Sequence, residues 1–170
     1  MIATGGRREG DLLNTAANNS TRARDPMSDT TPESQARAAT AALIRDYYAA
    51  FNRGDTDAML SYLTDDVIHD VNQGERRASK EKFRAFNARM THNYKEELRD
   101  IVVLVSKDAT RAAAEFNVHG IYKNTEEGLP EAMGQKYVLP AGTFFAIRDG
   151  KISRVTTYYN LTDWIAQVAG

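Results

Sequence analysis

Cysteine is absent from the 170-residue sequence. Without cysteine the chain can form no disulfide, carries no thiolate nucleophile and cannot build the zinc or iron–sulfur sites that use cysteine ligands. A chain without disulfides fits a reducing compartment, and we therefore expect a cytoplasmic protein.

The sequence also lacks an excess of positive charge and a long apolar run. Its formal net charge is -1, so it has no basic surplus with which to bind phosphates. No run approaches the roughly 18 apolar residues that cross a bilayer, and residues 1–10 lack the apolar core of a signal peptide. We therefore expect neither a nucleic acid nor a membrane as a partner.

Apolar residues are scarce before residue 36. Residues 1–35 are rich in Gly, Asn, Ser, Thr, Arg and Asp, which is typical of a disordered tail. Met27 is a plausible true start, so we interpret residues 1–26 as a candidate start-site artefact. The remaining residues, 36–170, have the length of one globular domain.

The start of this domain has the periodicity of an amphipathic helix. Ile44, Tyr47, Tyr48 and Phe51 are spaced at i, i+3, i+4 and i+7, so they share one face. This stripe predicts a helix over residues 34–51 with its aromatic face buried.

Capping residues mark the helices that follow. Asp55, Ser79 and Thr162 are residue types that accept hydrogen bonds from the first free N–H groups of a helix, and apolar residues at helical spacing follow each of them. We expect helices after residues 55 and 79 and a short helix at the C-terminus.

The remaining segments have the composition of β-strands and predict an α+β fold. Asp149 and Gly150 form a strong hairpin signal between the last two strands. Helices that precede a mostly antiparallel sheet define the α+β class, and a curved sheet around a long helix leaves a cone that can hold a ligand. The predicted strands are Val67–Val71, Ile101–Val105, Thr110–Tyr122, Tyr137–Arg148 and Lys151–Tyr159.

An ionisable pair, His69 and Asp70, interrupts the apolar run of the first strand. A carboxylate among apolar side chains costs free energy unless it is paired, so Asp70 is either a satisfied structural group or a functional group with a tuned pKa. Alternation along a strand sends the two side chains to opposite faces. The sequence leaves open which of them faces a cavity.

Further polar residues are candidates for substrate binding. Glu115, Asn117 and His119 alternate along one strand face, which either lines a pocket or faces water or a second subunit. Asn72 and Asn160 are candidate hydrogen-bond donors that orient a substrate. No H-x-H or H-E-x-x-H pair occurs, so we predict no metal site, and no nucleophile elbow supports a Ser-His-Asp triad.

The order of elements, together with Tyr47–Asp55, Leu63–Val67 and Arg148–Ile152, resembles the NTF2-like superfamily and within it the SnoaL-like, ketosteroid-isomerase-related branch. The resemblance covers roughly residues 36–168. It implies a cone in which a curved, antiparallel-rich sheet wraps around the N-terminal helices, and it implies a homodimer. The same fold serves isomerases, cyclases, epoxide hydrolases, dehydratases and non-enzymatic binding proteins, so the activity must be argued from the site.

The resemblance also implies a site. Ketosteroid isomerases use an Asp base on the strand after the second helix, with a helix-borne Tyr and a protonated Asp in the oxyanion hole. Asp70 matches the base and Tyr47 matches the tyrosine. The second acid should fall near Gly142 or Thr143, neither of which is an acid.

We therefore expect a small-molecule pocket protein that performs general acid–base chemistry on a hydrophobic carbonyl compound without a cofactor, as an isomerase or a polyketide cyclase. Asp70 and Tyr47 are the expected catalytic residues. The residues expected to bind the substrate are Asn72, His119, Asn160 and His69. The alternative is a non-enzymatic ligand-binding or dimeric interaction module.

Overall fold

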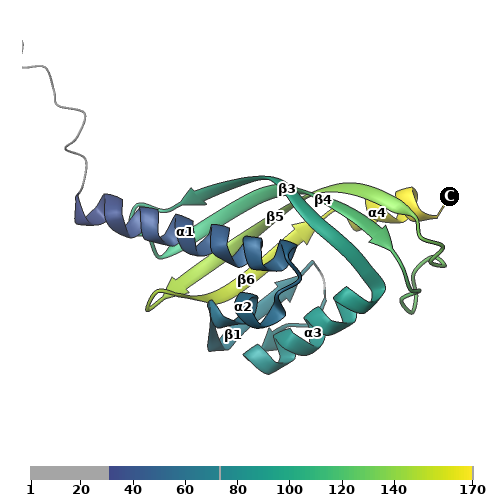
Figure 1. Cartoon of the computed structure of the whole chain (residues 1–170), viewed down its shortest axis with the longest axis horizontal. Helices are drawn as coiled ribbons and strands as arrows, with labels where there is room; N and C mark the ends of the chain where they lie inside the picture. The colour runs from purple at the N-terminus through teal and green to yellow at the C-terminus, as the bar shows by residue number, and fades with distance from the viewer. Residues whose placement is uncertain (1–30, 73, 170) are drawn as a thin grey trace, which may run out of the picture.

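Three helices precede most of a six-stranded sheet, and a fourth helix ends the fold (Figure 1). This computed structural model describes residues 31–72 and 74–169, so most of the expected tail lies outside the described residues. The helices are α1 (Pro32–Asn52), α2 (Thr56–Ser61), α3 (Lys80–Asn93) and α4 (Leu161–Val168). The strands are β1 (Leu63–Val71), β2 (Arg77–Ala78), β3 (Tyr94–Val105), β4 (Arg111–Tyr122), β5 (Lys136–Arg148) and β6 (Lys151–Tyr159).

The helix caps explain where α1 and α4 begin. The Thr31 hydroxyl accepts a hydrogen bond from the Ser34 amide at 3.1 Å, so α1 begins two residues earlier than expected. Pro32 suits the first turn because the N–H group that proline lacks would have no acceptor within the helix there. Asn160, not Thr162, caps α4. The expected caps of α2 and α3 are confirmed.

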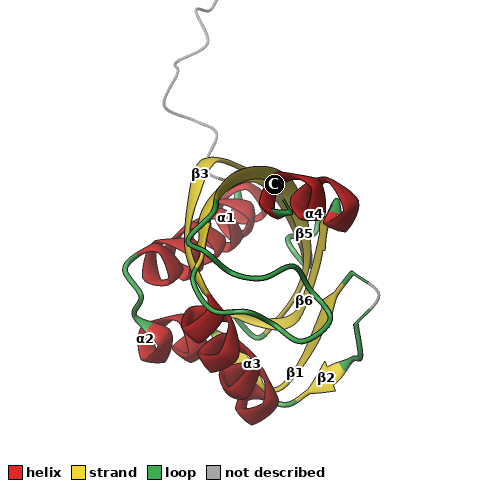
Figure 2. Cartoon of the chain, turned by 90° about the vertical axis from the view of Figure 1, so that its right-hand side faces the viewer, coloured by secondary structure: helices red, strands yellow, loops and turns green. Residues whose placement is uncertain are grey.

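The sheet has the order β2-β1-β6-β5-β4-β3 and is antiparallel except where β1 pairs with β6. Figure 2 shows the sheet curving around one side of the molecule, with α1, α2 and α3 on the other. This arrangement confirms the predicted α+β class. Among the described residues, no helix is long and apolar enough to cross a bilayer; the cytoplasmic location stays a prediction.

A bulge divides β3 into two halves. Asp100 has a φ of 56°, and the register with β4 shifts between Arg99 and Val102. The sequence predicted only the half after the bulge, because only Ile101–Val105 is a continuous apolar run. The half that begins at Tyr94 alternates polar and buried residues and is held as a strand by its pairing with β4.

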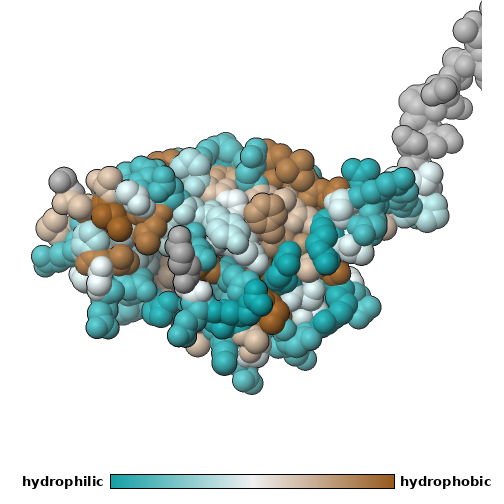
Figure 3. Space-filling view, turned by 180° about the vertical axis from the view of Figure 1, so that it is seen from behind, coloured by the Kyte–Doolittle hydropathy of each residue, from teal (hydrophilic) through white to brown (hydrophobic). Residues whose placement is uncertain are grey.

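The two faces of the sheet have different surroundings. The inner face packs against the aromatic stripe of α1, where Tyr48 lies edge-on to Phe116 and Phe145. The outer face, seen in Figure 3, carries apolar side chains among polar ones. The large apolar side chains exposed on it are Val102, Leu104, Val138, Phe144 and Tyr158.

Candidate functional site

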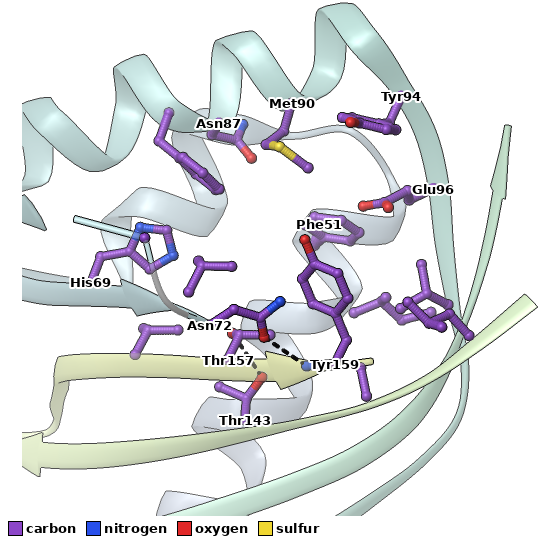
Figure 4. Close-up of a pocket in the computed structure, with 18 of the residues that line it drawn as sticks. Phe51, His69, Asn72, Asn87, Met90, Tyr94, Glu96, Thr143, Thr157 and Tyr159 are labelled. Carbon is purple, nitrogen blue, oxygen red and sulfur yellow. Dashed lines mark hydrogen bonds between the residues drawn. The ribbon is translucent and has the colours of Figure 1, made fainter. Parts of the chain in front are cut away.

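A cavity of about 430 Å³ lies between the inner face of the sheet, α1, α3 and the loop over residues 123–135. Figure 4 shows part of its wall. Aromatic and aliphatic side chains make up most of the lining, so the cavity suits an apolar ligand, and the aromatic rings favour a flat one. These aromatic residues are Tyr47, Tyr48, Phe51, Phe83, Phe86, Tyr94, Phe116, Tyr137, Tyr159 and Trp164.

His69 faces this cavity from β1. Its imidazole is 3% exposed and lies edge-on to Phe86, with ring centres 4.7 Å apart. Burial and the nearby Arg77 guanidinium lower the pKa of His69 to about 4, so the ring is neutral at pH 7. Its Nδ1 atom has no hydrogen-bond partner among the described residues. A neutral imidazole of this kind can accept a proton from a bound ligand.

Asp70 lies on the opposite face of β1 and is not among the residues that line the cavity. Arg76 donates to both carboxylate oxygens, at 2.8 Å and 3.0 Å, and the Thr156 hydroxyl donates at 3.4 Å. The Arg76 guanidinium holds the pKa of Asp70 below its usual range. Of the two neighbouring side chains, His69 therefore faces the cavity and Asp70 faces away from it. The structure gives Asp70 the contacts of a satisfied structural group, and the predicted role of Asp70 as the base gains no support.

Tyr47 and Asn72 line the cavity as expected. Tyr47 is buried on α1, and burial raises the pKa of its hydroxyl, so the phenol stays protonated and able to donate. Asn72 directly follows β1 and has a φ of 42°, a conformation that Asn tolerates better than most residues. Its Oδ1 accepts a hydrogen bond from the Tyr159 amide at 3.0 Å, which orients the side chain (Figure 4).

His119 and Asn160 do not line the cavity, so the structure gives their expected substrate-binding roles no support. On β4 the neighbours Phe116 and Val118 point inward, so alternation sends His119 to the outer face of the sheet. The Asn160 side chain accepts from the Asp163 amide at 3.1 Å as the cap of α4. Its role is therefore local and structural.

The cavity holds an acid that the sequence reasoning missed. Glu96 lies on β3 between the inward-facing Tyr94 and Leu98, and the Tyr137 hydroxyl donates to its Oε1. Burial raises the pKa of Glu96, with the Tyr137 hydrogen bond opposing in part. Figure 4 shows Glu96 across the cavity from His69. The sequence does contain a sign of this acid: Glu96 alternates with Tyr94 and Leu98, and this spacing puts its carboxyl group on the buried face of the strand.

Gly120 on β4 makes room for the tyrosine that holds this acid. A Cβ atom at position 120 would lie 2.0 Å from Cζ of Tyr137, far inside van der Waals contact. The Tyr137 ring therefore crosses β4 where no side chain intervenes. Among the described residues, no group of three or more His, Asp or Glu side chains could hold a metal ion.

Comparisons with known proteins place this chain in a family. A family model described as a SnoaL-like domain matches residues 44–155. A comparison with curated proteins found no match. Three crystal structures that are similar to this chain are of proposed polyketide cyclases.

The Xanthomonas campestris pv. campestris protein is 55% identical, with 78% of this chain and 98% of that chain covered and a TM-score of 0.76. For the Pseudomonas putida KT2440 protein the identity is 58%, the coverage 76% and 98%, and the TM-score 0.75. For the Silicibacter sp. TM1040 protein the identity is 59%, the coverage 78% and 96%, and the TM-score 0.76.

Proposed function

The chain belongs to the SnoaL-like family and has the NTF2-like cone expected from its sequence, and from this premise we propose that it is a cofactor-independent acid–base enzyme. Its substrate is a hydrophobic carbonyl compound that binds in the aromatic cavity, and its reaction is a cyclisation or an isomerisation. Three similar structures are those of proposed polyketide cyclases, which supports the cyclisation.

One observation carries the proposal: a neutral imidazole and a partly buried acid lie across one cavity from each other. The His69 ring lines the cavity, and its Nδ1 atom lacks a hydrogen-bond partner among the described residues, while the Tyr137 hydroxyl donates to Glu96. Groups whose environments push their pKa values in opposite directions suit opposite roles in proton transfer. His69 is therefore the proposed base, in the place expected for Asp70, and Glu96 is the proposed hydrogen-bond donor.

The proposed reaction begins with a proton transfer. The His69 imidazole accepts a proton from the carbon next to a carbonyl group, and the C–H electron pair moves onto the carbonyl oxygen. The resulting enolate oxygen accepts hydrogen bonds from the Tyr47 hydroxyl and from the Glu96 carboxyl in its protonated form, the form that burial of Glu96 favours. The carboxyl group replaces the acid that neither Gly142 nor Thr143 can supply.

The second step distinguishes the two reactions. In a cyclisation the enolate carbon forms a bond to a second carbonyl carbon of the same molecule, and the new alkoxide takes the proton back from the His69 imidazolium. In an isomerisation the imidazolium returns the proton to the γ-carbon instead. Either sequence restores His69 and consumes no cofactor.

The same cavity could serve a ligand-binding protein without catalysis, and one observation favours that second candidate. The pKa of His69 is about 4, whereas a general base works best with a pKa near the operating pH. A binding module would occupy the cavity and transfer no proton.

Hydrogen–deuterium exchange at the methyl group of 2-acetylnaphthalene tests the proposal. We expect catalysed exchange in the wild type and a loss of at least about 100-fold in His69→Phe, which keeps the ring contacts but has no base. Glu96→Gln should also slow exchange. Asp70→Asn and the outer-face control His119→Gln should stay within about threefold of the wild type.

The outcomes separate the candidates. If Asp70→Asn abolishes exchange and His69→Phe does not, the assignment to Asp70 from the sequence is right and ours is wrong. If the wild type binds 2-acetylnaphthalene without exchanging its protons faster than buffer, the binding module is the better description.

We further propose that two copies associate through the outer face of the sheet. Val102, Leu104, Phe144 and Tyr158 are each about half exposed on this face. In register, Leu104 on β3 is opposite Ala113 on β4, which is opposite Phe144 on β5, so this apolar row runs across three strands. Burial of such a row against its own copy would remove it from water.

A further inference from the structure

Two arginines flank one aromatic ring at the His69 end of the cavity. The guanidinium carbon of Arg77 lies 4.2 Å from the centre of the Phe86 ring, and that of Arg89 lies 5.4 Å from it. Both arginines line the cavity, and the His69 ring lies edge-on to Phe86. A ligand that reaches His69 therefore comes close to guanidinium groups.

Within the described part of the chain, only one of these two charges is neutralised. Arg89 pairs with Glu126, with 3.5 Å between Nε and Oε1. Arg77 has no ion-pair partner among the described residues, and its Nη1 donates at 3.2 Å to the uncharged Glu75 carbonyl oxygen. The nearby Asp70 carboxylate does not pair with Arg77, because it accepts hydrogen bonds from Arg76 on the other face of β1.

Arg76 and Arg77 are neighbours in the chain, but they differ in exposure and in ion pairing. Arg76 is mostly exposed and makes a two-pronged ion pair with Asp70. Arg77 is partly buried against the cavity, where burial and repulsion from Arg89 lower its pKa. A guanidinium group that is partly desolvated and unpaired favours the arrival of an anion.

We propose that the ligand carries a carboxylate and that Arg77 binds this carboxylate beside His69, while the aromatic lining holds a flat, unsaturated body. The planar fork of a guanidinium matches a carboxylate in two hydrogen bonds. This inference names the substrate class of the proposed function and rests on it, because the same cavity is used. In this inference Arg77 orients the substrate by binding its carboxylate.

A carboxylate at Arg77 would also change the proton affinity of His69. Two charged groups act on the imidazole: Arg77 on β2 disfavours protonation and Asp70 on β1 favours it, while burial disfavours it most. A bound carboxylate offsets the field of Arg77, so the imidazolium becomes less unfavourable. His69 is then a stronger base with the ligand bound than without it.

A matched pair of probes tests the inference by direct binding. 1-Hydroxy-2-naphthoate carries a carboxylate, and 1-hydroxy-2-acetonaphthone carries an uncharged acetyl group of similar size at the same carbon. Trp164 is the only tryptophan of the chain and lines the cavity, so its fluorescence reports binding of either probe. Titrations use the wild-type full chain, Arg77→Gln, Arg77→Lys and the neighbouring control Arg76→Gln.

We expect Arg77→Gln to weaken binding of the naphthoate at least about tenfold and binding of the acetonaphthone less than about threefold. Arg77→Lys should retain part of the preference for the naphthoate, since it keeps the charge but not the fork. Arg76→Gln should leave the preference intact. With saturating naphthoate, the pKa of His69 followed by NMR should rise above about 4.

Equal losses for both probes in Arg77→Gln, or no loss for either, would overturn the inference, as would failure of the naphthoate to bind the wild type. These results are independent of catalysis. If His69→Phe still exchanges protons but Arg77→Gln discriminates between the probes, the proposed function fails and the anion site stands. If the exchange experiment succeeds and the probes bind equally to the wild type, the anion site alone fails.

Discussion

The imidazole of His69 lies nearly parallel to the ring of Phe83, with ring centres 4.0 Å apart and 20° between the two planes. Phe83 lies on α3, and Phe86 on the same helix packs edge-on against the imidazole. The two phenylalanine rings replace water around His69. This burial, together with the Arg77 guanidinium, lowers the pKa of His69 and keeps the histidine neutral at pH 7.

The stability of the fold should therefore depend on the ionisation of His69. The folded chain lowers the pKa of this imidazole from the ordinary histidine value of 6.5 to about 4. Between these values the unfolded chain binds more protons, so stability falls as the pH falls from about 6.5 towards 4. We expect this residue to remove about 2 kcal/mol of unfolding free energy between pH 7 and pH 5.

Urea unfolding at pH 7 and pH 5 measures this loss. The difference in unfolding free energy between the wild type and His69→Phe should change by about 2 kcal/mol between the two pH values. His119→Gln serves as the control, because His119 lies on the outer face, and its curve should follow that of the wild type. Parallel curves for the wild type and His69→Phe would mean that the imidazole is not held neutral.

The contact between Gly120 and Tyr137 gives a second prediction. Gly120→Ala forces the Tyr137 ring away from its place, because the new Cβ would lie 2.0 Å from Cζ. We expect a destabilisation of about 1–3 kcal/mol and a slower exchange reaction, since Tyr137 holds Glu96. Thermal unfolding and the 2-acetylnaphthalene assay measure the two effects.

Gly142 on the neighbouring strand β5 offers the matched control. A Cβ atom there would meet the Ala114 carbonyl oxygen at 3.7 Å, an ordinary contact. Gly142→Ala should therefore be tolerated. If the two alanine variants behave alike, the Tyr137 ring does not depend on the missing side chain at position 120.

The proposed association through the sheet gives a third prediction. Phe144→Asp places a charge in the apolar row of the outer face, and we expect it to shift a dimer to a monomer because burial of an unpaired carboxylate is unfavourable. Light scattering after size-exclusion chromatography measures the mass. Met133→Asp is the control, since Met133 is 77% exposed in the loop before β5 and lies outside the row. A wild-type mass of one chain would contradict the association itself.

Local patterns in the sequence were sufficient for much of the fold. Asp55 and Ser79 cap their helices as predicted, and the aromatic stripe that includes Tyr47 is buried. These features depend on interactions within a few residues, so a single sequence contains them. The extent of β3 depends on its pairing with β4 across the bulge at Asp100, and periodicity alone cannot supply a partner strand.

The site was harder to predict because alternation fixes two faces but does not say which one is inside. Nothing local distinguishes His69 from Asp70 in that respect; the answer comes from Phe83 and from Arg76, which approach from opposite sides. Glu96 was missed for a related reason. The resemblance predicts the second acid near Thr143, whereas the carboxyl group of this cavity comes from Glu96 on β3.

The parallel pairing of β1 with β6 bears on the order in which the molecule can be assembled. Asp70 is in register with Thr156 and His69 with Val155, so the strand with the proposed base finds its long neighbour β6 only in the last part of the chain, whereas its short neighbour β2 follows closely. During synthesis, β1 leaves the ribosome well before β6 exists, and it must wait without its long partner while the intervening strands are made. Conditions that slow translation after residue 71 should prolong the interval in which β1, with its inward-facing apolar residues, is open to chaperones or to another nascent copy.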